Sequence, residues 1–297
     1  MRHPRGRGSA GEPELGTGLR AVLWLAAFAA GFAVTGLEVA LGRLLAPHFG
    51  ASLTVWASVI AAVVAALALG YPLGGILADR HPGPGLPLGA LLLGGLLGAL
   101  LGVAAPPWLR ASMQGIALSG PAYSLRLAGA LALFGLPCLL LASVAPAVLR
   151  VTLRERATAG RDAGVLFALG SLGSVLGVLL SALWWIPMLG LRATFLLLAA
   201  VAMAPPLFAM LSGLARVGAV TRAAALILLA AFPLLPEAVV SDDSGRLLHD
   251  ADSGLQHIRV LARDTPEHRR RWLMLDEGWT AHSALLEPSL ATGDVWD

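Results

Sequence analysis

Residues 19–80 read LRAVLWLAAFAAGFAVTGLEVALGRLLAPHFGASLTVWASVIAAVVAALALGYPLGGILADR, which is two long apolar runs joined by a short turn at residues 47–52. A helix rises 1.5 Å per residue, so about 20 apolar residues cross the hydrocarbon core of a bilayer. Each run is long enough, and the stretch predicts two membrane-spanning helices. The first run also carries Glu38 and Arg43 at or near membrane depth. An acid inside a span is costly, so Glu38 requires a partner or a function.

The composition of the whole chain extends this prediction. Apolar residues make up 57% of the sequence and charged residues only 13%, whereas a soluble domain has roughly 25% charged residues. All 21 basic residues are arginines, they are scattered, and the net charge is only +3, so nucleic-acid binding has no support. The single cysteine, Cys138, excludes an internal disulfide and a cysteine-based metal site.

Apolar length predicts an all-α integral membrane bundle of about seven transmembrane helices, followed by a small C-terminal β-meander. The predicted spans lie near residues 20–45, 53–78, 86–105, 125–149, 163–189, 192–212 and 219–236. The chain therefore divides into a disordered polar tail (1–18), a transmembrane domain (19–236) and a β-rich segment (237–297). The lipid bilayer is the expected environment, and a multi-pass protein of the cell (inner) membrane is the expected location.

Small residues and prolines add expectations about packing within the bundle. Gly70 and Gly74 are four residues apart, as are Gly173 and Gly177, and this spacing lets helix backbones approach closely in lipid. The adjacent residues Pro205–Pro206 predict a kink in the sixth span, and Pro106–Pro107 predict the end of the third.

The arginines predict the orientation of the bundle. Cytoplasmic segments carry an excess of basic residues. With the N-terminus inside, the arginines before residue 237 divide into eleven on inside segments and four on outside segments. This favours an N-terminus inside the cell, and seven spans would then place the C-terminal segment outside.

The C-terminal segment has the pattern of a short antiparallel sheet. Residues 255–262 alternate, with Ile258, Val260 and Ala262 on one face, and residues 272–275 form a second short apolar run. Turn signals follow at residues 264–267 and 276–278. A meander of about 50 residues has too small a core to be stable alone.

Several of these stretches together resemble the membrane part of bacterial spermidine-synthase-like proteins, also called fused transporter/spermidine synthases. The stretches that carry the resemblance are residues 38–56, 70–80, 167–177 (FALGSLGSVLG) and 189–194 (LGLRAT). The C-terminal segment is similar to the N-terminal β-domain of a polyamine aminopropyltransferase. A Tyr-Gln pair and a Leu-Asp-Gly strand end of that domain correspond to Leu255-Gln256 and to residues 275–278 (LDEG).

The resemblance implies a link to polyamine biosynthesis. Family members transfer an aminopropyl group from decarboxylated S-adenosylmethionine, a co-substrate, to putrescine, and no further cofactor is implied. Their catalytic aspartates lie on a Rossmann-like domain after the meander, and no strand with a Gly-rich turn follows residue 240 here. We therefore expect a membrane-anchoring part without catalytic residues of its own, inactive without a separately encoded catalytic subunit. Only Gln256 is carried over, as a contact to the thioadenosine part of the donor.

Two interpretations of the intramembrane charges remain open. Glu38 and Arg43 are five residues apart and do not stack directly on one helix. In one interpretation Glu38 is a ligand in a transporter or scaffold of small cations or polyamines. In the other, the two residues form a structural pair, or Arg43 reaches the interface while Glu38 bonds a neighbouring helix. One acid is little for a transport route, which favours the structural interpretation. His257, His268 and His282 match no metal-site spacing and are interpreted as solvated.

Overall fold

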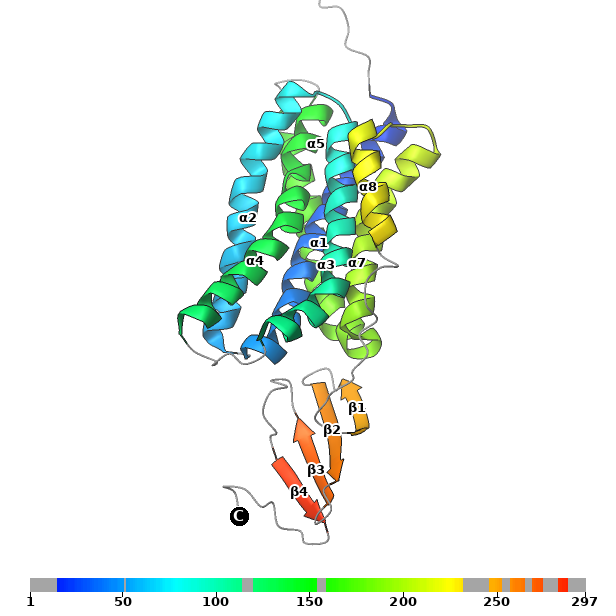
Figure 1. The fold of residues 1–297 in the computed structure, drawn as a ribbon. Coiled ribbons are helices and arrows are strands. Elements are labelled where there is room, and N and C mark those ends of the chain that lie inside the picture. Colours follow the sequence, from blue (N-terminus) through cyan, green and yellow to red (C-terminus); the bar gives the residue numbers. More distant parts are fainter. Residues whose placement is uncertain are drawn as a thin grey trace, which may run out of the picture.

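The computed structural model describes residues 15–50, 52–113, 120–153, 159–231, 246–252, 257–264, 269–274 and 283–287. Most of these residues are helical, and a small sheet ends the chain (Figure 1). The helices are α1 (Thr17–Phe49), α2 (Leu53–Arg80), α3 (Gly85–Met113), α4 (Pro121–Ala142), α5 (Val144–Thr152), α6 (Ala159–Leu180), the π-helical turn η1 (Ser181–Trp185), α7 (Ile186–Leu211) and α8 (Ala219–Ala231).

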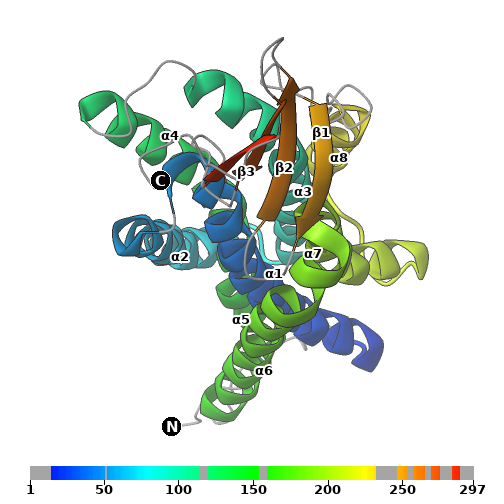
Figure 2. The ribbon, with the colours of Figure 1, turned by 90° about the horizontal axis from the view of Figure 1, so that it is seen from below.

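Helix α1 is the centre of the bundle. It contacts each of α2, α3, α4, α5, α6 and α7, and Figure 2 shows it surrounded by the other helices. Its side chains are accordingly among the most buried, including Leu23, Ala26, Ala40 and Leu45, each fully buried. The other long helices expose large apolar side chains such as Val64, Leu69 and Phe167, as helices facing lipid do.

The bundle has two ends, which we name after residues that mark them. The Arg20 end holds the starts of α1, α3, α6 and α8 (Figure 1). There Gly18 lies beside Leu214, and Gly85 lies beside the carbonyl of Arg216. The Phe49 end holds the ends of α1 and α3 and the starts of α2 and α4, and the Tyr123 hydroxyl of α4 donates to the carbonyl of Phe49 at 2.7 Å.

The apolar helix that runs from Ala159 to Leu211 folds back on itself at Gly190. Gly190 has φ 76° and ψ 171°, a region that only glycine adopts readily. Ser181 Oγ and Leu198 Cδ1 lie 3.0 and 3.3 Å from the position of a Cβ placed on Gly36. Two residues on opposite sides of Gly190 thus flank the same residue of α1, so the chain reverses direction between them.

Glycines allow the closest helix contacts, as their spacing predicted. A Cβ on Gly173 would meet the carbonyl oxygen of Phe28, and one on Gly177 would meet that of Phe32, so α6 packs directly on the backbone of α1. On α2, a Cβ on Gly74 would meet the carbonyl oxygen of Ser143, at the junction of α4 and α5. The predicted role of these small residues in helix packing is confirmed.

The sheet is a four-stranded antiparallel meander in the order β1–β2–β3–β4. Its strands are β1 (Arg246–Asp252), β2 (His257–Asp264), β3 (Arg269–Met274) and β4 (Ser283–Glu287). Leu261 pairs with Leu247 of β1 and Trp272 of β3 and is 2% exposed, so the sheet has a small buried centre. Figure 1 shows the sheet beyond the Phe49 end of the bundle, opposite the Arg20 end.

The mostly helical bundle is confirmed, but the seven spans remain a prediction. Within the described residues, five helices are long and apolar enough to cross a membrane, and α8 is shorter. These helices are compatible with a multi-pass membrane protein.

Two details of the predicted helices were wrong, the end of α3 and the start of α1. Helix α3 continues through Pro106 and Pro107 to Met113, because neighbouring groups in a bundle can satisfy the backbone that prolines release. The kink at Pro205 and Pro206 stays a prediction: α7 continues through both prolines, and its residue with non-helical backbone angles is Gly190. Helix α1 begins at Thr17, inside the predicted polar tail, while residues 1–14 lie outside the described part.

Candidate functional site

Glu38 is the charged side chain placed deepest in the bundle among the described residues. It lies in α1 eleven residues before Phe49, about 16 Å along the helix axis. Its side chain is half-buried, and it forms no hydrogen bond or ion pair with any described residue. The buried Cys138 thiol of α4 lies within electrostatic range of its carboxylate. A carboxylate without a counter-charge at this depth can take up a proton or a cation.

Arg43 follows Glu38 on the same helix, toward the Phe49 end. No ion pair joins the two side chains, although both lie in the described part of the chain. Five residues turn a helix by about 140° beyond a full turn, so the two side chains point to different faces of α1. The direct ion pair between Glu38 and Arg43, which was one of the structural interpretations, is therefore not formed.

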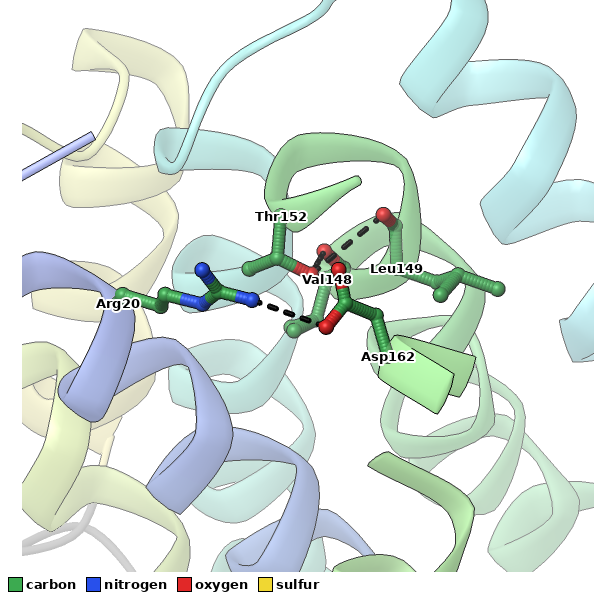
Figure 3. A network of polar contacts seen from close by, with 5 residues as sticks. All are labelled: Arg20, Val148, Leu149, Thr152 and Asp162. Atoms are coloured by element: carbon green, nitrogen blue, oxygen red, sulfur yellow. Dashed lines mark hydrogen bonds and ion pairs between the residues drawn. The ribbon is translucent and has the colours of Figure 1, made fainter. Parts of the chain in front are cut away.

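The Arg20 end contains a polar network that joins α1 to α6 (Figure 3). Arg20 Nη2 lies 3.1 Å from Asp162 Oδ1, and both side chains are largely buried, with 19% and 15% exposed. The Arg20 guanidinium also lies over the Trp24 ring, 5.0 Å from its centroid. Nearby, Thr152 Oγ1 donates to the carbonyl of Val148 at 2.8 Å and satisfies an acceptor near the end of α5. The network ties together the starts of α1 and α6, which are 142 residues apart in the sequence.

A second ion pair at the same end joins α2 to α5. Arg150 Nε donates to Asp79 Oδ1 at 2.9 Å, and both side chains are exposed. Asp79 comes just before Arg80, the last residue of α2, and its partner is a side chain of another helix. Solvent screens such an exposed pair, so it orients the helix ends more than it stabilises them.

Among the described residues, four side-chain polar atoms are buried without a hydrogen-bond partner: Arg20 Nε, Arg126 Nη1, Ser181 Oγ and Trp272 Nε1. The Ser181 hydroxyl opens the π-helical turn, is 0% exposed and has no hydrogen-bond partner. π-Helical turns often occur at functional sites. The Nη1 atom of Arg126 in α4 is also buried without a hydrogen bond. Arg126 could have been singled out from the sequence, because an arginine inside a predicted span is unusual. Ser181 could not, because serines are common in apolar runs.

The C-terminal strands fall close to their predicted positions, but the predicted binding residue cannot be placed. β2 begins at His257 and β3 ends at Met274, against predicted strands at 255–262 and 272–275. Gln256 lies outside the described residues, as do His268 and His282. Within the described part of the chain, no group of three or more His, Cys, Asp or Glu side chains could hold a metal ion.

Comparisons with known proteins identify no family for this chain. No protein-family model matches it, and neither the curated proteins nor the solved structures contain a significant match. The structure therefore supports a mostly helical bundle with a small antiparallel sheet, and a functional assignment has to be argued from its residues.

Proposed function

We propose that this chain is the membrane-embedded part of a spermidine-synthase-like protein, which anchors an aminopropyltransferase-like domain to the cell membrane. The observation that carries the proposal is the antiparallel meander that follows the helical bundle. β2 begins directly after Gln256 and β3 ends directly before residues 275–278, the two stretches that carry the resemblance, which supports the proposal. The order of parts, bundle and then meander, is the order that the resemblance requires.

We propose seven membrane crossings. The reversal at Gly190 supports two crossings within residues 159–211, one along α6 and η1 and one along α7. α1, α2, α3 and α4 with α5 supply four, and α8 begins the last. Described arginines also gather at the Arg20 end, which favours this end as cytoplasmic. They are Arg20, Arg161 beside Asp162, Arg150 and Arg80 beside Asp79, and Arg216 beside Gly85.

Catalysis would require a nucleotide-binding domain that packs against the meander. Attack of an amine on the carbon next to a sulfonium needs donor and acceptor held in line, and a group that takes up the amine proton. A four-stranded sheet covers one side of an adenosine at most, whereas sites of this kind enclose most of their ligand. In the proposal a Rossmann-like subunit supplies the other side, and Gln256 contacts the thioadenosine of the donor.

The side of the membrane on which the sheet lies gives the decisive test, because the anchoring proposal and the distribution of arginines predict opposite sides. The donor is cytosolic, so the anchoring function needs the sheet inside the cell, whereas seven crossings with the Arg20 end inside place it outside. Reporter domains fused after Asp297 and inserted at residues 154–158 measure both sides in intact cells. A cytoplasmic sheet, with residues 154–158 also cytoplasmic, would support the anchor and contradict the seven crossings. An external sheet would overturn the anchoring proposal and favour the second candidate.

The second candidate is a multi-pass transporter of small cations or polyamines, and the unpaired carboxylate of Glu38 favours it. If the bundle transports, Glu38→Gln should abolish cation or polyamine uptake into vesicles while the protein stays folded. The matched control is Asp79→Asn, which removes an exposed acid at the Arg20 end. Unchanged uptake in Glu38→Gln would exclude Glu38 as the cation ligand.

A catalytic assay tests the proposed donor contact. The chain with a nucleotide-binding subunit should release thioadenosine from decarboxylated S-adenosylmethionine, and the chain alone should not. Gln256→Ala should then raise the donor KM roughly tenfold, the effect of one lost hydrogen bond of about 1.4 kcal/mol. Release by the chain alone, or an unchanged KM, would contradict the assignment.

A further inference from the structure

Arg126 is a cation near the start of α4 without a partner among the described residues. It lies in the predicted fourth span, five residues after α4 begins at Pro121. Its Nη1 atom is buried and has no hydrogen bond, and none of the ion pairs between described residues involves it. The rest of the Arg126 side chain is only partly buried, so the guanidinium has one donor without a partner and remains accessible to an anion.

The surroundings of Arg126 are fixed by the contact between α4 and α1. The Tyr123 hydroxyl donates to the carbonyl of Phe49 at 2.7 Å, and the two rings meet edge to face with centroids 5.3 Å apart. This holds the first turn of α4 against the last turn of α1. Arg126 comes three residues after Tyr123 and therefore lies on the same face, one turn deeper. Side chains on a helix lean toward its N-terminus, so Arg126 leans toward the Phe49 end.

The electrostatics at this position favour an anion. α4 has no acidic residue in its first turn and no side-chain cap on Gly120, so the positive end of its dipole is left open. The charged side chains that the structure describes near the Phe49 end are Arg43, Arg126 and Arg192, all basic. Glu38, the nearest acid on α1, lies about 16 Å deeper than Phe49 along the helix.

Arg126 lies three residues after Tyr123, where an apolar span begins, so we expect it near the phosphate layer of a bilayer. Tyr123 and the half-exposed Trp108 near the end of α3 have the character of interfacial anchors. Arg126 lies about 4.5 Å deeper than Tyr123 along α4, within the reach of an extended arginine side chain. A guanidinium can bind two phosphate oxygens at once. A phosphate would therefore give Arg126 Nη1 the acceptor that no described residue provides.

We propose that Arg126 binds a phosphate group at the Phe49 end of the bundle, supplied by the headgroup of an anionic phospholipid. The open N-terminus of α4 adds a second favourable electrostatic contribution to the same anion. The bound lipid lies beside the contact between Tyr123 and Phe49 and holds the start of α4 at the membrane interface.

Lipid titration of the delipidated full chain in detergent tests the proposal. The probes are phosphatidylglycerol, phosphatidylcholine and inorganic phosphate, and the readouts are the thermal midpoint and the lipid adducts seen by native mass spectrometry. Phosphatidylglycerol should bind saturably, and Arg126→Gln should weaken its apparent affinity at least about tenfold. The matched control is Arg192→Gln, which removes an exposed arginine at the same end and should leave the affinity unchanged.

The other outcomes are equally informative. Equal affinity in the wild-type chain and in Arg126→Gln, or equal loss in Arg192→Gln, would overturn the site. Saturable binding of inorganic phosphate that depends on Arg126, without lipid binding, would keep the anion site and overturn the lipid as its source. If Arg126→Gln does not fold, Arg126→Lys replaces it. Lysine keeps the positive charge but cannot bind two phosphate oxygens at once as a guanidinium does. The affinity of Arg126→Lys should therefore lie between that of the wild-type chain and that of Arg126→Gln.

Discussion

The packing of α6 on α1 can be tested with two glycines of the same helix. A Cβ on Gly173 would meet the backbone of α1, namely the carbonyl oxygen of Phe28 and, at 3.1 Å, the nitrogen of Phe32. Backbone atoms cannot rotate away as a side chain does, so α6 itself would have to move. A Cβ on Gly164 meets nothing within 4 Å. We therefore expect Gly173→Ala and Gly164→Ala to have opposite effects.

The size of the difference follows from two contributions. Each substitution gains helix propensity, about 1 kcal/mol for glycine to alanine. Only Gly173→Ala adds the cost of overpacking, about 1–3 kcal/mol. The propensity cancels in the comparison, so Gly173→Ala should be less stable than Gly164→Ala by about 1–3 kcal/mol. In a chain of this size that is a difference of roughly 2–10 °C in the thermal midpoint.

Unfolding in detergent micelles, followed by helical circular dichroism, measures the two midpoints under the same conditions. Gly164→Ala should be as stable as the wild-type chain or more so, which controls for any general effect of alanine on α6. Midpoints that agree within about 1 °C, or a more stable Gly173→Ala, would refute the direct backbone contact between α6 and α1.

The polar residues of the bundle give three further predictions, each measured as a free energy of unfolding in detergent. Asp162→Asn should cost about 1–3 kcal/mol, because the largely buried Arg20 guanidinium loses its partner; a cost below 0.5 kcal/mol, on the order of a surface pair, would contradict this. Asp79→Asn should cost less than about 1 kcal/mol, because Asp79 and Arg150 are exposed, and a larger cost would show a buried role. Glu38→Gln should be neutral or stabilising, because the amide removes an unpaired charge and keeps an oxygen acceptor. A marked loss of stability would reveal a charged partner of Glu38.

The sequence by itself determined the elements of the bundle. Apolar length is a local property, and the two helices of the first hairpin, α1 and α2, lie within a few residues of the predicted runs at 20–45 and 53–78. The predicted boundary between the spans 163–189 and 192–212 coincides with Gly190, where the backbone turns back. The spacing of Gly173 and Gly177 also predicted close packing, since small residues mark helix contacts in lipid wherever the partner lies.

Only the tertiary structure decided which groups meet. The sequence contains Arg20 and Asp162 but nothing that pairs them across 142 residues, because such a pair depends on how α6 is placed against α1. The absence of a described partner for Glu38 and for Arg126 depends in the same way on the surrounding helices. Helix formation follows from local apolar runs, whereas the pairing of charges follows from packing between distant segments. The candidate sites could therefore be named from the sequence only as isolated residues, and their partners could not.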